Sequence, residues 1–261
     1  MLIDIGVNLT NSRFDKDREN VINQAQLAGV TKLIITGTNV VESQQALDIC
    51  QHYPNLFCTA GVHPHDADNV SNGYLQQLAE LAKNKQVKAI GECGLDFNRN
   101  FSTPENQQRV FTEQLELAKQ LSLPVFLHQR DAFNTWQSLL QEQLNELTGG
   151  VSHCFTGNLE ELKTCLDMGL YIGITGWICD ERRGQELFDI AKYIPLDRIM
   201  VETDAPYLPP RNIRPKLKSS RNEPKYLPYV VRTLASAMKV GEDELIKHSS
   251  NNATKLFKLA G

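Results

Sequence analysis

Histidines and carboxylates follow short apolar runs at several places in this sequence. The residues in these positions are His63, Glu92, His128, His153, Glu202 and Asp204. Imidazole and carboxylate ligands without thiolates suit Zn²⁺, Mn²⁺ or Mg²⁺. Carboxylates can also bridge two ions, and such a pair clamps the attacking and leaving oxygens in phosphoryl hydrolysis. The residue types therefore predict a metal-dependent hydrolase, and the spacing leaves open whether one ion or two bind.

One histidine or glutamate after an apolar run is usually an ordinary polar residue at the end of a strand. The prediction of a metal site rests on several such residues recurring at equivalent positions. In a barrel of parallel strands, the carboxyl ends of all strands share one rim, where active sites are found. Residues far apart in the chain would then meet at that rim.

Eight short apolar runs are candidates for the strands that carry these residues. They are Leu2–Val7, Lys32–Thr38, Phe57–Val62, Val87–Gly91, Pro124–Leu127, Gly150–His153, Tyr171–Thr175 and Ile199–Glu202. Most lack strict alternation, which is typical of parallel strands buried on both faces. Amphipathic stretches separate them, such as Glu105–Leu121, which Thr103 and Pro104 precede as a helix start signal.

This rhythm predicts an α/β protein of the (β/α)8 TIM-barrel class, with the metal site at the C-terminal ends of the strands. We expect one domain over residues 1–261, since such a barrel needs about 250 residues. A doubly wound open sheet is the alternative fold. No GxGxxG motif follows the first apolar run, which argues against a dinucleotide-binding version of that fold.

Composition limits the cellular location and the classes of protein that fit this sequence. The formal net charge of −4 argues against nonspecific coating of nucleic acid through bulk charge, but not against a nuclease. The six cysteines form no CxxC pair, so neither a disulfide framework nor a zinc knuckle is expected. The N-terminus lacks a charged leader, and no apolar run approaches the roughly 18 residues of a membrane span. We expect a cytoplasmic protein, a monomer without a membrane partner.

The segment Ala205–Pro228 is rich in proline and basic residues and follows the eighth run. Loops of this length in compact domains are usually functional or mobile. We predict phosphate contacts from Arg211 and Arg221 in this loop and from Arg182 in an earlier one. Trp177 is either a platform for a base or a half-buried anchor.

Several motifs together resemble the TatD-type metal-dependent deoxyribonucleases. They are DIGVNLT, GVHPHD, IGECGLDFNRNFS, HCFTG, ITGWICDERRG, ETDAPYLPPR and SSRNEP. That family is similar to amidohydrolase-type barrels and cleaves phosphodiesters. The resemblance implies that Glu92, His128, His153 and Asp204 are metal ligands, and that His63 and Glu202 have roles in the site.

The resemblance also implies a Mg²⁺-dependent 3′–5′ exonuclease acting on single-stranded DNA, and on RNA as a further substrate, with roles in DNA repair or degradation. One motif departs from the family, where an HxH pair follows the first aspartate. Here Gly6 and Asn8 stand at those positions after Asp4. Losing two imidazoles favours Mg²⁺ over Zn²⁺ and leaves the number of ions open.

These residues suggest a mechanism in which Asp204 or Glu202 accepts a proton from the attacking water. His63 is the candidate for assisting the departing 3′ oxygen. Two alternatives remain from the sequence. One is a lactonase or amidase on the same barrel, since a fold does not settle a substrate. The other is a binding barrel that lost catalysis together with the HxH pair.

Overall fold

The structure, a computed structural model, describes residues 1–259. Eight strands in this part of the chain lie in one sheet in the consecutive order β1 to β8. Their bounds are β1 (Leu2–Val7), β2 (Val30–Ile35), β3 (Leu56–Ala60), β4 (Val87–Asp96), β5 (Val125–Arg130), β6 (Gly150–Ser152), β7 (Tyr171–Ile174) and β8 (Ile199–Val201). The consecutive order confirms the (β/α)8 barrel class, and the doubly wound alternative is wrong because its strand order would reverse.

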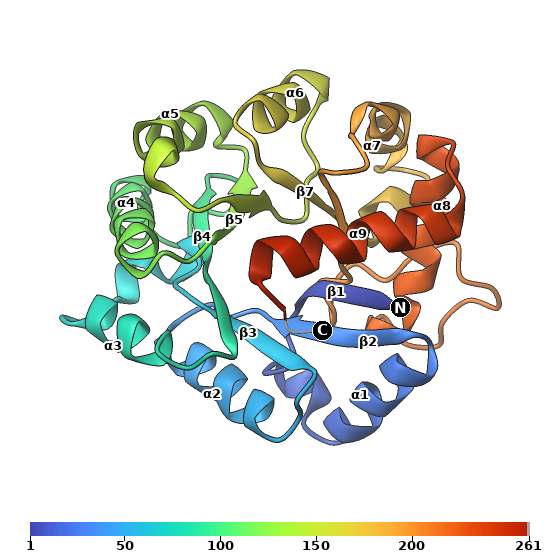
Figure 1. The fold of residues 1–261 in the computed structure, drawn as a ribbon, viewed down its shortest axis with the longest axis horizontal. Coiled ribbons are helices and arrows are strands. Elements are labelled where there is room, and N and C mark those ends of the chain that lie inside the picture. Colours follow the sequence, from blue (N-terminus) through green and yellow to red (C-terminus); the bar gives the residue numbers. More distant parts are fainter. Residues whose placement is uncertain (260–261) are drawn as a thin grey trace. The chain divides into compact units, whose positions relative to one another are not determined.

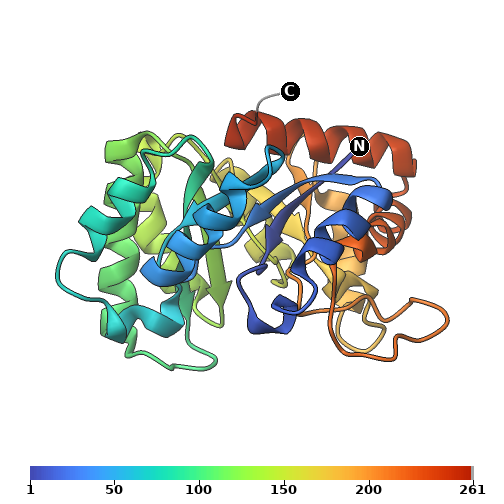
Figure 2. The same cartoon turned by 90° about the horizontal axis from the view of Figure 1, so that it is seen from below.

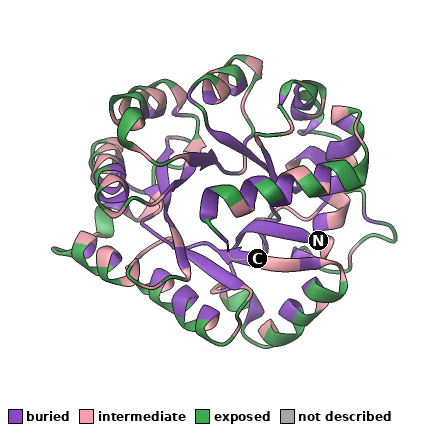
Figure 3. Ribbon diagram, viewed as in Figure 1, coloured by how far each residue is buried: buried purple, intermediate pink, exposed green. Residues whose placement is uncertain are grey.

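Helices follow the strands in alternation (Figure 1). They are α1 (Arg18–Leu27), α2 (Val40–Gln51), α3 (Tyr74–Leu81), α4 (Pro104–Leu121), α5 (Phe133–Gln143), α6 (Leu159–Asp167), α7 (Gln185–Ile190), α8 (Leu227–Met238) and α9 (Glu242–Phe257). The strands are mostly buried, whereas the helices expose one side (Figure 3). None of the helices in residues 1–259 has both the length and the apolar character needed to cross a membrane.

Two strands extend well beyond their predicted ends. β4 continues through Glu92 to Asp96, and β5 continues through His128 to Arg130. A polar residue between glycines reads as a strand end in sequence. The pairing of β4 with β5 nevertheless continues after an irregularity between Gly91 and Cys93. Glu92 and His128 therefore lie inside strands and not beyond them.

The chain forms two compact units. The second unit comprises Thr36–Ser152 and Met168–Leu170, with β3 to β6 and α2 to α5. Its strands pair in parallel, β3 with β4, β4 with β5 and β5 with β6. The first unit comprises Met1–Ile35, His153–Asp167 and the chain from Tyr171 onward, with β1, β2, β7 and β8.

Two buried glutamines on α4 hold the polar segments of the second unit. Gln107 accepts a hydrogen bond from the Asp96 backbone at 2.8 Å and donates one to the Asp96 carbonyl at 3.1 Å. Gln114 does the same for Val62, at 2.7 and 3.0 Å. The two glutamines are seven residues apart, so they share one face of the helix. The Thr103 side chain caps α4, as predicted.

The first unit closes around a buried carboxylate on β1. Asp4 accepts hydrogen bonds from the backbone of Thr203 at 2.9 Å and from its hydroxyl at 2.5 Å. Burial raises the pKa of Asp4 to about 7. At the other end of the strands, Asn252 of α9 donates to the carbonyls of Leu196 and Ile199. Figure 2 shows α9 beside the start of the chain and the long loop after β8 at the opposite end of this unit.

Gly94 allows β4 and β5 to approach closely, and we predict that Gly94→Ala strongly destabilises the protein. Its φ of +148° is unfavourable for other residues, and a Cβ would lie 1.8 Å from the His128 carbonyl oxygen. We expect a loss of about 3 kcal/mol or more in urea unfolding. Gly241→Ala is the control, because nothing lies within 4 Å of its Cβ. Equal effects of the two substitutions would contradict this account of β4.

The Asp4 carboxyl gives a pH dependence of stability that can be measured. The folded state keeps this proton up to about pH 7, whereas the unfolded chain releases it near 3.8. The unfolded state therefore binds fewer protons in this window, and the free energy of unfolding falls as pH rises, by at most about 1.4 kcal/mol per pH unit. Asp4→Asn should remove this fall. If the free energy of unfolding changed equally with pH in the two proteins between pH 4 and 7, Asp4 would not be the source of the fall.

Candidate metal and active site

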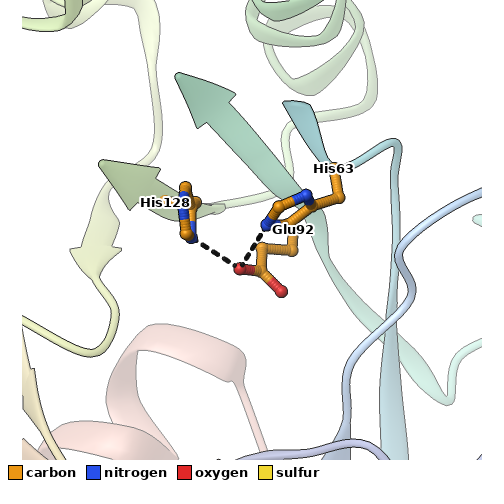
Figure 4. Close-up of side chains that lie close together, drawn as sticks. All are labelled: His63, Glu92 and His128. Atoms are coloured by element: carbon orange, nitrogen blue, oxygen red, sulfur yellow. Dashed lines mark hydrogen bonds and ion pairs between the residues drawn. The ribbon is translucent and has the colours of Figure 1, made fainter. Parts of the chain in front are cut away.

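Two histidines flank one carboxylate in the second unit. His63 follows β3, Glu92 lies in β4 and His128 lies in β5, and Figure 4 shows both rings turned toward the carboxylate. Glu92 Oε1 lies 2.9 Å from His128 Nδ1 and 3.4 Å from His63 Nε2. One ligand atom from each of the three residues lies within 4.8 Å of the others. The arrangement could hold a metal ion.

The segment after β2 positions two members of this group through its backbone. The His63 N–H donates to the Thr38 carbonyl at 2.7 Å, and the Glu92 N–H donates to the Gly37 carbonyl at 2.8 Å. Neighbouring carbonyls thus fix both residues. Gly61 permits the close approach of β3 to β4, because a Cβ there would lie 2.4 Å from the Gly91 carbonyl carbon.

The ring of His63 is poised to donate a hydrogen bond. Its Nδ1 accepts the backbone N–H of His65 at 3.0 Å. Burial lowers the pKa of His63 to about 3, so the ring is neutral at pH 7. A neutral ring that accepts at Nδ1 carries its proton on Nε2, the atom facing Glu92. That tautomer favours donation from Nε2 over binding of a cation there.

The ring of His128 lies between two carboxylates. Its Nδ1 faces Glu92, and its Nε2 lies 3.3 Å from Asp96 Oδ2. Burial would raise the pKa of Asp96, but hydrogen bonds from His128 and His65 hold it well below its usual range. A carboxylate that receives one N–H of a histidine orients the ring so that the other nitrogen can bind a metal. Glu92 and His128 therefore fit a divalent cation, as an oxygen and a nitrogen ligand.

Sequence reasoning missed two residues of this group, His65 and Asp96. His65 Nε2 lies 2.9 Å from Asp96 Oδ2, and Asp96 is 2 % exposed. The place of Asp96 inside β4 was not predicted, because the expected strand ended at Gly91. The HxH spacing of GVHPHD and the four-residue spacing from Glu92 to Asp96 were signals that could have revealed both.

The first unit holds its own group of predicted site residues. His153 Nδ1 lies 3.1 Å from Glu202 Oε2, and Glu202 Oε1 accepts the backbone N–H of Cys154 at 2.5 Å. Gly173 leaves room for this carboxylate, since a Cβ would lie 2.5 Å from Glu202 Oε1. Glu202 therefore orients the ring of His153, as Asp96 orients the ring of His128.

Asp204 follows β8 in this unit and accepts a hydrogen bond from Asn8 Nδ2 at 2.9 Å. Asn8 occupies a position where the family pattern has a histidine, and its amide here acts as a donor to a carboxylate. Cys154 stays outside the predicted ligand set. Burial raises the pKa of its thiol to about 12, so it is protonated at neutral pH.

The three arginines predicted to contact phosphates are each paired with carboxylates. Arg221 donates to Asp17 at 2.8 and 2.7 Å and to Glu223 at 2.9 Å. Its pKa is raised, chiefly by the hydrogen bond to Asp17. Arg221 therefore anchors the loop after β8 to the start of α1. Substrate contact by this residue stays a prediction.

The other two arginines lie on an acidic turn. Arg182 donates to both oxygens of Asp180 at 3.2 Å, and Arg211 lies 3.4 Å from Glu181. Trp177 donates from Nε1 to the Arg183 carbonyl at 3.2 Å, and the Arg183 guanidinium lies 4.3 Å from its ring centroid. These contacts favour the half-buried anchor role for Trp177.

Known proteins resemble this chain over its whole length. Proteins named 3′-5′ ssDNA/RNA exonuclease TatD are 55% identical in Pectobacterium atrosepticum and 51% identical in Escherichia fergusonii. Each alignment covers 99% of this chain and 100% of the relative. Among solved structures, a TatD homologue from Escherichia coli K12 is 30% identical, with a TM-score of 0.90 over 99% of this chain and 98% of the other.

A sequence model of a protein family also matches this chain. The model described as TatD related DNase matches residues 3–258, nearly all of the sequence. The relatives match this chain over their full length, and the solved homologue shares its fold. This chain belongs to the TatD related DNase family.

Proposed function

We propose that this protein is a metal-dependent exonuclease that removes nucleotides from the 3′ end of single-stranded DNA and also degrades RNA. The observation that carries the proposal is the group of His63, Glu92 and His128 in a member of the TatD related DNase family. Its relatives at 51 to 55% identity are named for this activity. We further propose that it acts as a cytoplasmic monomer in DNA repair or degradation.

Mg²⁺ is the metal we propose, because carboxylates supply a large share of the donors. The proximity of Glu92 and His128 supports them as ligands in this proposal, and His153 and Asp204 are added on the family resemblance alone. When bound, such an ion lowers the pKa of a water molecule and offsets the charge of the phosphate. Asp96 and Glu202 orient the two histidines through the hydrogen bonds described above.

The chain's own residues supply the proton chemistry in this proposal. His63 is neutral and donates from Nε2, so it assists the departing 3′ oxygen by a hydrogen bond as that oxygen gains charge. A neutral imidazole can serve in this way without transferring a proton, and the 3′ oxygen then takes its proton from solvent water. Asp204 or Glu202 accepts a proton from the attacking water. Glu202 is fully buried and already accepts two hydrogen bonds, so the geometry favours Asp204.

The first test is metal dependence on end-labelled single-stranded DNA. Because the ligands are imidazole and carboxylate, EDTA should abolish hydrolysis, and Mg²⁺ or Mn²⁺ should restore it. The products should shorten from the 3′ end. Small esters and amides assayed in parallel address the lactonase or amidase alternative. Full activity in EDTA, or turnover of the small substrates alone, would overturn the proposal.

Glu92→Gln should separate the metal ligand from the scaffold. The substitution removes one charge with little change in volume, so melting without metal should stay near that of the wild type. Turnover should fall about 100-fold or more, and stabilisation by added metal should shrink. Glu80→Gln, at an exposed carboxylate on α3, should change neither. Normal turnover in Glu92→Gln would place the catalytic centre elsewhere.

Arg221→Ala tests whether this residue anchors a loop or contacts substrate. The substitution leaves Asp17 and Glu223 without their shared cation, so the free energy of unfolding should fall by about 1–3 kcal/mol. Arg232→Ala, which removes an exposed pair at 3.5 Å, should cost under about 1 kcal/mol. A phosphate contact by Arg221 would also lower the salt slope of DNA binding by about 0.7. Unchanged stability would refute the anchor role.

A further inference from the structure

We infer that residues 97–101, together with Arg130, form the platform that holds the single strand, with Phe101 stacked on a base and Arg99 and Arg130 on phosphates. This strand platform rests on the proposed function and names the residues that position its substrate. All of its residues belong to the second unit, as does the group of His63, Glu92 and His128. Sequence reasoning singled out neither Phe101 nor Arg130.

Phe101 is a large exposed apolar side chain that is fixed to the candidate site. It is 64% exposed, and its ring makes an edge contact with His65 at 4.7 Å between centroids. His65 in turn contacts His63 at 4.2 Å. A row of rings thus leads from solvent to the site. An exposed ring in such a place offers an unpaired base a surface to stack on.

Arg99 supplies positive charge next to this ring. Its guanidinium lies 5.8 Å from the centroid of Phe101. Its backbone N–H donates to Asp96 Oδ1 at 3.0 Å, which ties the turn to the carboxylate that orients His128. A polyanion that approaches a site lined with carboxylates needs cations nearby to offset repulsion. Arg99 stands where such a cation would act.

Arg130 stands at the end of β5, two residues after His128, so both side chains lie on the same face of the strand. The carbonyl of Arg130 accepts the backbone N–H of Phe97 at 3.0 Å. The Asn98 amide donates to Asp131 at 2.7 Å, which joins the same two segments again. The turn and the end of β5 therefore form one surface.

The ion pairs of the protein distinguish these arginines from those predicted earlier. Within residues 1–259, neither Arg99 nor Arg130 pairs with a carboxylate, and both are exposed. Arg182, Arg211 and Arg221 are all held by aspartate or glutamate. A guanidinium without a carboxylate partner binds a phosphate without first breaking an ion pair. The two unpaired arginines are therefore better placed to hold a nucleic-acid strand.

The combination of exposed ring and cations selects the class of ligand. Phosphates bind arginines in any nucleic acid, but stacking on Phe101 needs a base whose face is free. In a duplex, both faces of internal bases are already covered. The strand platform thus accounts for a preference for single strands without base-specific contacts.

Binding of fluorescein-labelled oligothymidylate, measured by anisotropy in EDTA, tests the inference without turnover. Phe101→Ala should raise Kd about 5- to 100-fold, and Phe101→Trp should restore binding. An oligomer with abasic terminal nucleotides should bind the wild type and Phe101→Ala equally. Arg99→Ala and Arg130→Ala should each lower the slope of log K against log salt by about 0.7. All variants should melt like the wild type, because the three side chains are exposed.

Two matched controls share the chemistry of these residues but lie away from the strand platform. Tyr193→Ala removes an aromatic ring that is 50% exposed in the first unit, and Arg109→Ala removes an α4 arginine paired with Glu113. Neither should change Kd. Unchanged binding in Phe101→Ala and in both platform arginine variants would overturn the inference. If the wild-type protein binds the oligomer as described but does not degrade DNA with Mg²⁺ or Mn²⁺, the proposed function is overturned and the strand platform is not.

Discussion

A carboxylate buried at the end of a strand must be surrounded by hydrogen-bond donors, and Asp96 gathers donors from three segments. They are the ring of His65 after β3, the ring of His128 in β5 and the backbone N–H groups of the turn after β4. An unsatisfied carboxylate there would cost several kcal/mol. This need holds the candidate metal group and the neighbouring turn in one fixed relation, so the rim of the second unit depends on it.

The first unit uses the same device with different residues. Glu202, which is fully buried, accepts from the ring of His153 and from the backbone of Cys154. In both units an acidic residue without solvent access aims a histidine that the sequence marks as a ligand. Ring orientation therefore comes from residues outside the predicted ligand set. A motif that records only metal ligands misses these orienting carboxylates.

Local patterns in the sequence predicted the fold well. The run Leu2–Val7 matches β1 at both ends, and Thr103 caps α4 as expected. The extension of β4 through Glu92 was not predictable in that way, because pairing with β5 decides it and not the polarity of the strand. The pairing of Arg221 with Asp17 was equally hidden, since 204 positions separate the two residues. Charged residues in a loop look available for substrate until their partners are known.

The two glutamines of α4 have a consequence for conditions far from neutrality. Gln107 and Gln114 hold the end of β4 and the segment before His63 entirely through primary amides. An amide neither gains nor loses a proton between strong acid and strong alkali, unlike the acids and imidazoles beside it. The backbone of Asp96 and the backbone of Val62 therefore keep these hydrogen bonds to α4 while the charges beside them are titrated.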